Sequence, residues 1–92
     1  MKKHIKIYFQ HFKIAQDDRI LCEYCGMQAV DVHHIDNKGL GGSKKKDDIN
    51  NLIALCRKCH DKAHNELISK SDLRLVHNYK LSGRPIYTKN HY

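Results

Sequence analysis

Apolar residues recur along the chain at spacings that predict short helices and strands. Over about residues 4–14 the apolar positions follow helical spacing, although part of the segment also alternates as a strand would; a helix is the favoured interpretation. A second helix is expected over about residues 71–82, with Ser71 or Asp72 as its N-cap and Gly83 beyond its end.

Two strands and a further helix are expected between these terminal helices. Residues 29–36 read as an extended segment in which alternation sends the side chains of His33 and His34 to opposite faces. Residues 51–55 form a short apolar strand, and a helix follows over residues 56–64. The adjacent histidines are therefore predicted to serve different purposes.

The small size of the chain bears on what holds it together. With 92 residues, no tryptophan and two phenylalanines, the chain has room for one domain (1–92) with a modest core, and a bound metal is the natural source of further stability. No apolar run is long or continuous enough for a signal peptide or a membrane span, so we expect a cytoplasmic protein. Its cysteines are then expected as metal ligands rather than disulfides.

Those cysteines form two Cys-x-x-Cys pairs, Cys22 with Cys25 and Cys56 with Cys59. Two such pairs wrap one tetrahedral Zn²⁺ ion in many small domains, whereas a redox site needs only one pair near a βαβ pattern. The pairs predict a structural zinc site. The thirty residues between them exceed the usual gap of about 15–20 and carry the two adjacent histidines.

A second metal site is predicted from three histidines. His60 and His64 are four residues apart, so on a helix their rings share one face, and His33 can join them from the strand. Three imidazoles with an open position are typical of catalytic metal sites, although a second structural zinc would use the same residues. Apart from these three and His34, the remaining histidines are interpreted as incidental surface or packing residues: His4, His11, His77 and His91.

The net charge of +7 suggests a polyanionic partner, although charge of this size can also serve solubility alone. Residues 37–50 form a polar, glycine-containing loop with three consecutive lysines, which is suited to lie near phosphates. The residues expected to contact nucleic acid are Lys44, Lys45, Lys46, Arg57, Lys58 and Lys62.

These features together resemble the HNH endonuclease family, in particular small zinc-stapled members of phage or bacterial type. The resemblance covers about residues 20–66 and is carried by four segments: Cys22-Glu-Tyr-Cys25-Gly, Val32-His33-His34-Ile35, Gly41-Gly42, and Asn51-Leu-Ile-Ala-Leu-Cys56-Arg-Lys-Cys59-His60. It implies a small α+β domain of the ββα-metal, treble-clef-like type with flanking helices.

The resemblance also implies roles for individual residues. His34 matches the general base that activates water, and Asn51 matches the asparagine that braces the loop between the strands. His33 and His60 match ligands of a catalytic divalent metal, for which imidazoles favour Zn²⁺, Mn²⁺ or Ni²⁺ over Mg²⁺. His64 matches a third ligand found in the nuclease-toxin branch, which many relatives lack.

The implied activity is hydrolysis of phosphodiester bonds in nucleic acid, most simply double-stranded DNA, leaving a 5′ phosphate and a 3′ hydroxyl. A domain of this size is expected to cut with low sequence specificity, or to depend on a targeting partner or a homodimer. The alternatives are a zinc-dependent nucleic-acid binding module that does not cleave, and a structural zinc domain that binds a protein partner.

Overall fold

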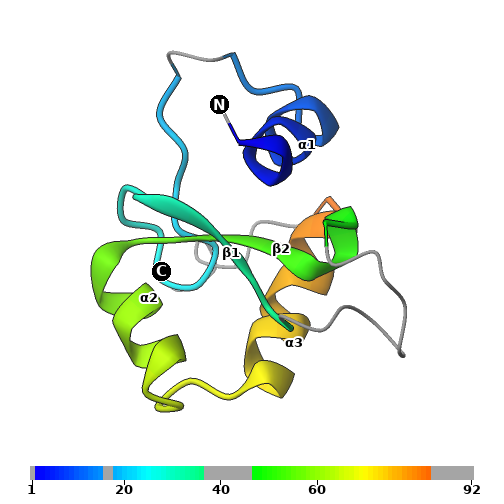
Figure 1. Cartoon of the computed structure of the whole chain (residues 1–92). Coiled ribbons are helices and arrows are strands. Elements are labelled where there is room, and N and C mark those ends of the chain that lie inside the picture. The colour runs from blue at the N-terminus through cyan, green and yellow to red at the C-terminus, as the bar shows by residue number, and fades with distance from the viewer. Residues whose placement is uncertain (1, 16–17, 37–46, 84–92) are drawn as a thin grey trace.

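The computed structural model describes residues 2–15, 18–36 and 47–83, and its elements are arranged as in Figure 1. In chain order these are α1 (Lys3–His11), β1 (Asp31–His34), the 3-10 helix η1 (Ile49–Asn51), β2 (Leu52–Leu55), α2 (Arg57–His64) and α3 (Lys70–Leu81). None of the described helices is long and apolar enough to cross a membrane.

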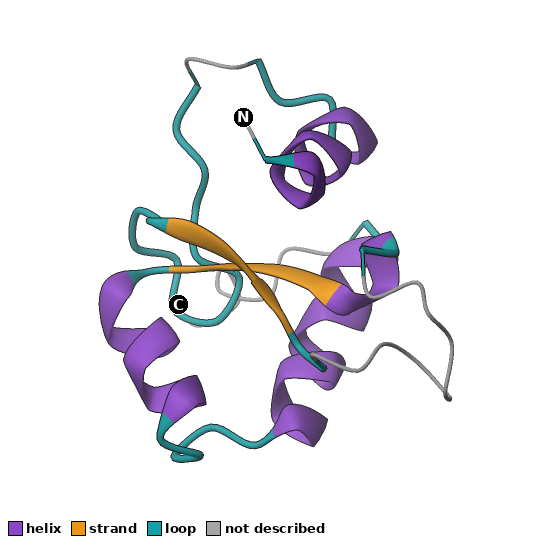
Figure 2. Cartoon of the chain, viewed as in Figure 1, coloured by secondary structure: helices purple, strands orange, loops and turns teal. Residues whose placement is uncertain are grey.

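The two strands form an antiparallel pair in which His33 lies opposite Ile53 and His34 opposite Leu52. β2 leads directly into α2, with Cys56 as the N-cap, so the centre of the chain is a ββα unit. α1 lies on one side of the strand pair, and α2 and α3 lie on the other (Figure 2). The predicted fold class, a small α+β domain with a two-stranded sheet and flanking helices, is confirmed.

The helix boundaries differ from the prediction at two points. α1 ends at His11 rather than near residue 14, because Lys13 has a positive φ of 57° and the Ile14 N–H donates to the Phe9 carbonyl oxygen, which closes the helix. α3 is capped two residues earlier than expected. The Ser69 hydroxyl accepts a hydrogen bond from the Asp72 N–H at 3.1 Å.

Two apolar clusters cover the two faces of the strand pair. The cluster on the α1 side contains Tyr8, Ala29, Val32, Leu52 and Ala54. The cluster on the side of α2 and α3 contains Ile35, Ile53, Leu55, Ile68 and Leu73 together with Cys22, Cys56 and Cys59. Both strands therefore contribute alternate side chains to separate small cores.

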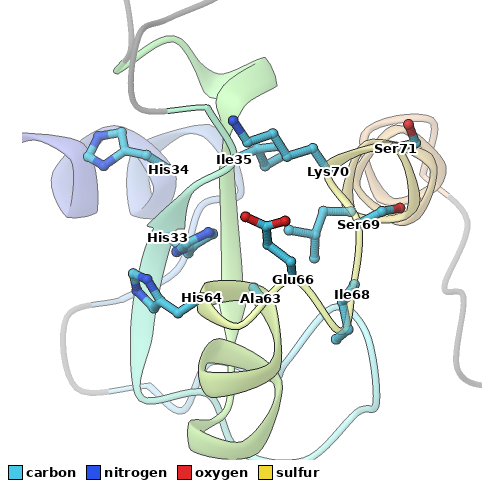
Figure 3. A pocket seen from close by; sticks show the side chains of 11 residues that line it. His33, His34, Ile35, Ala63, His64, Glu66, Ile68, Ser69, Lys70 and Ser71 are labelled. Atoms are coloured by element: carbon cyan, nitrogen blue, oxygen red, sulfur yellow. The ribbon is translucent and has the colours of Figure 1, made fainter.

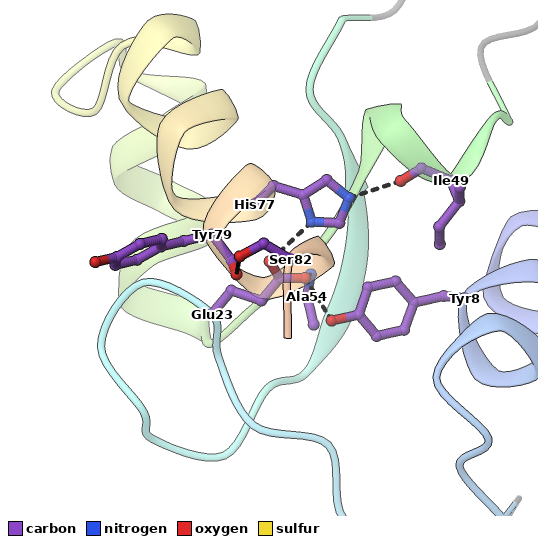
Figure 4. A network of polar contacts seen from close by, with 7 residues as sticks. All are labelled: Tyr8, Glu23, Ile49, Ala54, His77, Tyr79 and Ser82. Carbon is purple, nitrogen blue, oxygen red and sulfur yellow. Dashed lines mark hydrogen bonds and ion pairs between the residues drawn. The ribbon is translucent and has the colours of Figure 1, made fainter. Parts of the chain in front are cut away.

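A buried polar network joins the elements around these cores (Figure 4). Glu23 and His77 are 2% and 0% exposed, and Glu23 Oε1 lies 2.8 Å from His77 Nδ1. The Tyr8 hydroxyl donates to Glu23 Oε2, and burial raises the pKa of Tyr8, which keeps the phenol protonated. His77 Nε2 donates to the Ile49 carbonyl oxygen at 2.6 Å. His77, expected to be incidental, thus links α3 to η1 and to the segment that carries Cys22.

We expect His77→Leu to lower the free energy of unfolding by about 3–5 kcal/mol, because the substitution leaves the Glu23 carboxylate buried without its partner. Denaturant unfolding of the metal-loaded protein measures this loss. His11→Leu, at an exposed position, is the matched control and should change stability by less than about 0.5 kcal/mol. Adding Glu23→Gln to His77→Leu should recover part of the lost stability. If His77→Leu alone loses no more stability than His11→Leu, the role assigned to His77 is wrong.

Candidate functional site

The four cysteines lie together in the structure, and we refer to them as the cysteine cluster. Their Sγ atoms lie within 4.8 Å of one another, and Cys25 Sγ is 3.6 Å from Cys56 Sγ. Sulfur ligands of a tetrahedral zinc ion are about 3.8 Å apart at a Zn–S distance of about 2.3 Å, whereas a disulfide requires about 2.05 Å. The four thiols are therefore spaced to surround one metal ion.

Local backbone structure sets up this cluster. Gly26 has a φ of 84°, which turns the chain after Cys25, and its N–H donates to the Cys22 carbonyl oxygen. Cys56 caps α2 by accepting the Cys59 N–H on its sulfur. Burial raises the pKa of Cys56, but hydrogen bonds from the Cys59 N–H and neighbouring thiols outweigh burial and bring it to about 7. A thiolate ligand is thus accessible at neutral pH.

Three histidines form a second group, the three-histidine cluster. One ligand nitrogen from each of His33, His60 and His64 lies within 4.8 Å of the others, and the ring centroids are 4.5–5.3 Å apart. Burial, followed by the adjacent imidazoles, lowers the pKa of His33 to about 4. His33 is therefore neutral at physiological pH and has a lone pair available for a divalent ion. The predicted set of three imidazoles is brought together as the spacing suggested.

His34 leaves β1 on the opposite face and points away from His33 and His64 (Figure 3). Its Nε2 lies 2.7 Å from Asp47 Oδ1, and its ring lies against the ring of His4 with centroids 4.6 Å apart. The hydrogen bond to His34 lowers the pKa of Asp47, so that side chain is a carboxylate and can only accept. Nε2 of His34 therefore donates, and in the neutral imidazole the lone pair lies on Nδ1.

Residues from both faces of β1 line one cleft, which has a volume of about 580 Å³. It is lined by His33, His34, Ile35, Ala63, His64, Glu66, Ile68, Ser69, Lys70, Ser71 and Leu73. A group seated in this cleft can reach ligands of the three-histidine cluster and also His34.

Asn51 holds the chain just beyond β1. It is 0% exposed, its Oδ1 accepts the Asp36 N–H at 2.9 Å, and its Nδ2 donates to the Asp36 carbonyl oxygen at 2.8 Å. Its own carbonyl oxygen accepts the Ile35 N–H. The predicted bracing residue thus clamps the two residues that follow His34.

The residues of α2 that are predicted to contact phosphates fall on two faces of the helix. At about 100° per residue, Arg57 lies within about 60° of His60 and His64 around α2, whereas Lys58 and Lys62 lie roughly 120° or more from both. All three cations are exposed. Lys44, Lys45 and Lys46 lie outside the described residues, and their role stays a prediction.

Sequence reasoning missed two residues that contact His34 and one that lines the cleft. Asp47 falls in the predicted polar loop and His4 is expected to be incidental; neither has a spacing to His34 that would indicate contact. Lys70 lines the cleft, and its Nζ lies 3.8 Å from Asp36 Oδ1. Its position at the start of an amphipathic helix gave no signal of a link to the histidines.

Comparison with known proteins gives one match. Residues 22–66 match the family model described as HNH endonuclease, and this segment contains the cysteine cluster, the three-histidine cluster, His34 and Asn51. Comparisons with curated proteins and with solved structures found no match. Residues 22–66 thus match the HNH endonuclease family that the sequence motifs suggested.

Proposed function

We propose that this protein is a metal-dependent endonuclease that hydrolyses phosphodiester bonds in nucleic acid, with double-stranded DNA as its substrate. The match to the HNH endonuclease family supports nuclease activity with a metal ion. The observation that carries the proposal is the arrangement around β1, where three imidazoles gather on one face and a carboxylate-bound histidine lies on the other. A ligand set and a general base are thus kept apart beside one cleft.

The donor sets suit two different metals. The cysteine cluster fits a structural Zn²⁺ ion with all four positions filled by sulfur. His33, His60 and His64 fit a catalytic divalent ion, Zn²⁺, Mn²⁺, Ni²⁺ or Mg²⁺, with a position left for a phosphate oxygen. When bound there, such an ion supplies positive charge that offsets the charge developing on phosphorus and the leaving oxygen.

The chain's own residues supply the remaining chemistry. His34 accepts a proton from water through Nδ1, while Asp47 holds Nε2–H and so fixes the tautomer and the ring orientation. The water attacks phosphorus in line with the 3′ oxygen, which leaves a 5′ phosphate and a 3′ hydroxyl. Asn51 keeps the end of β1, and with it His34, in place.

Substrate contacts come from cations around the cleft. Lys70 lines the cleft, and Arg57 lies on the same face of α2 as His60 and His64. We also propose phosphate contacts by Lys44, Lys45, Lys46, Lys58 and Lys62. Such contacts give affinity without sequence preference, so targeting falls to a partner or to a homodimer. α1 and α3 pack on the ββα unit, and we treat residues 1–92 as one nuclease domain.

His34→Ala should lower the rate of plasmid nicking by about 10²–10⁴-fold, because it removes the general base. The assay compares the variant with His11→Ala, an exposed histidine in α1, in Zn²⁺, Mn²⁺, Ni²⁺ and Mg²⁺. DNA binding and the metal content of the cysteine cluster and the three-histidine cluster should be unchanged. Equal nicking by both variants would refute the role of His34. If the unsubstituted protein binds DNA in a salt-sensitive manner but cleaves it with none of the metals, the protein is a binding module.

His64→Ala should weaken metal binding by the three-histidine cluster by at least ~10-fold, since even loss of groups that only support a metal ligand costs about 10–100-fold. Cobalt titration distinguishes the two sites, because sulfur ligands give strong charge-transfer absorption and imidazoles do not. The sulfur signal should be unchanged in the variant. If cobalt binding by the three-histidine cluster is as tight as in His11→Ala, His64 is not a ligand.

Removal of the metal from the cysteine cluster should unfold the chain, because structural zinc contributes about 10–16 kcal/mol in zinc-finger peptides and the apolar cores here are small. Circular dichroism and metal content, measured during treatment with a strong chelator, should fall together. Adding Zn²⁺ back should restore both. Native secondary structure in a metal-free sample would show that the cores suffice alone.

A further inference from the structure

A third group of metal-binding side chains lies on the α1 face of β1. His4, His34 and Asp47 each offer one ligand atom, and these atoms lie within 4.8 Å of one another. The residues come from α1, from the last position of β1 and from the segment just before η1, and all three are partly buried. We refer to them as the His4–His34–Asp47 trio; it shares no residue with the cysteine cluster or the three-histidine cluster.

The chemistry of this trio suits a first-row divalent cation. Two imidazoles and one carboxylate are ligands that Zn²⁺ accepts at about 2.0–2.2 Å, which places ligand atoms about 3.3–3.5 Å apart in a tetrahedral site. His34 Nε2 and Asp47 Oδ1 are 2.7 Å apart, as expected for a shared proton. A separation larger by roughly 0.6 Å, within reach of side-chain rotation, allows an ion to replace that hydrogen bond.

Surrounding charges set the affinity of the trio relative to the other two groups. Asp31 lies close enough to His4 to favour a positive charge there. The positive charges of Lys2, near His4, and Lys3, near Asp47, oppose the binding of a cation. A site with one carboxylate and two adjacent lysines should bind a cation less tightly than four thiolates. Binding to the trio also breaks the His34–Asp47 hydrogen bond, so the trio should fill last as the metal concentration rises.

We propose that the His4–His34–Asp47 trio is an inhibitory site for a divalent cation such as Zn²⁺. The inhibition rests on the proposed function, because the activity that it affects is cleavage through His34. An ion that replaces the hydrogen bond to Asp47 binds His34 at Nε2, so the single proton of the neutral ring moves to Nδ1. His34 bound to an ion has no lone pair left to accept a proton from water, so metal in excess of that needed for catalysis stops the reaction.

Metal binding tests the site independently of activity. Equilibrium dialysis against rising free Zn²⁺ should give three equivalents per unsubstituted chain, the third being the weakest. At the concentration that fills the third site, His4→Ala and Asp47→Ala should each retain two equivalents, and His11→Ala should retain three. Circular dichroism checks that each variant is folded. Two equivalents in the unsubstituted protein, or a third that survives both substitutions, would overturn the site.

Cleavage tests the inhibition. Plasmid nicking by the unsubstituted protein and by His11→Ala should rise and then fall as Zn²⁺ increases. His4→Ala should reach a similar maximal rate, because His4 has no role in the proposed reaction, and its decline should begin at a zinc concentration at least ~10-fold higher. The same decline in both variants would overturn the inhibitory role. Absence of cleavage at every concentration would overturn the proposed function and the inhibition together, and dialysis would still report on the site.

Discussion

Alternation of side chains along β1 is the constraint on which the site depends. In a strand, successive residues face opposite sides, and a shift of register by one residue would exchange the two faces. Burial prevents that exchange, because Val32 packs in the α1-side core and Ile35 packs in the core under α2 and α3. His34 shares the face of Val32 and His33 shares the face of Ile35, so the apolar residues determine where each imidazole goes.

The cores that enforce this register are small, and the polar network and the cysteine cluster hold them together. Glu23 lies between Cys22 and Cys25, so the segment that supplies two sulfurs also supplies the carboxylate that binds Tyr8 of α1 and His77 of α3. Desolvating a carboxylate is costly, but here its oxygens accept several hydrogen bonds, and His77 is bonded at both ring nitrogens. Loss of either the network or the metal should therefore loosen both faces of β1.

The sequence predicted what depends on local spacing. The Cys-x-x-Cys pairs, the i and i+4 histidines and the alternation in β1 each span a few residues, and the structure brings together both predicted ligand sets. What it could not predict depends on packing between distant segments: Asp47 contacts His34 across 13 positions, and His77 contacts Glu23 across 54. Nothing in the spacing of these residues distinguishes them from surface charges. Helical periodicity alone would have placed Arg57 on the face of α2 that carries His60 and His64, and Lys58 and Lys62 away from it.

The proposed reaction requires that the general base does not become a ligand of the catalytic metal. A fourth imidazole near His33, His60 and His64 would close the open position that a phosphate oxygen needs. β1 prevents this by directing His34 away, and the Asp47 carboxylate then holds Nε2 on the α1 face while the cleft still reaches the ring. The carboxylate suited to that task is itself a metal ligand, and the imidazole of His4 lies beside it. Protection of the base from one ion thus creates, on the other face of the same strand, a place where another can bind.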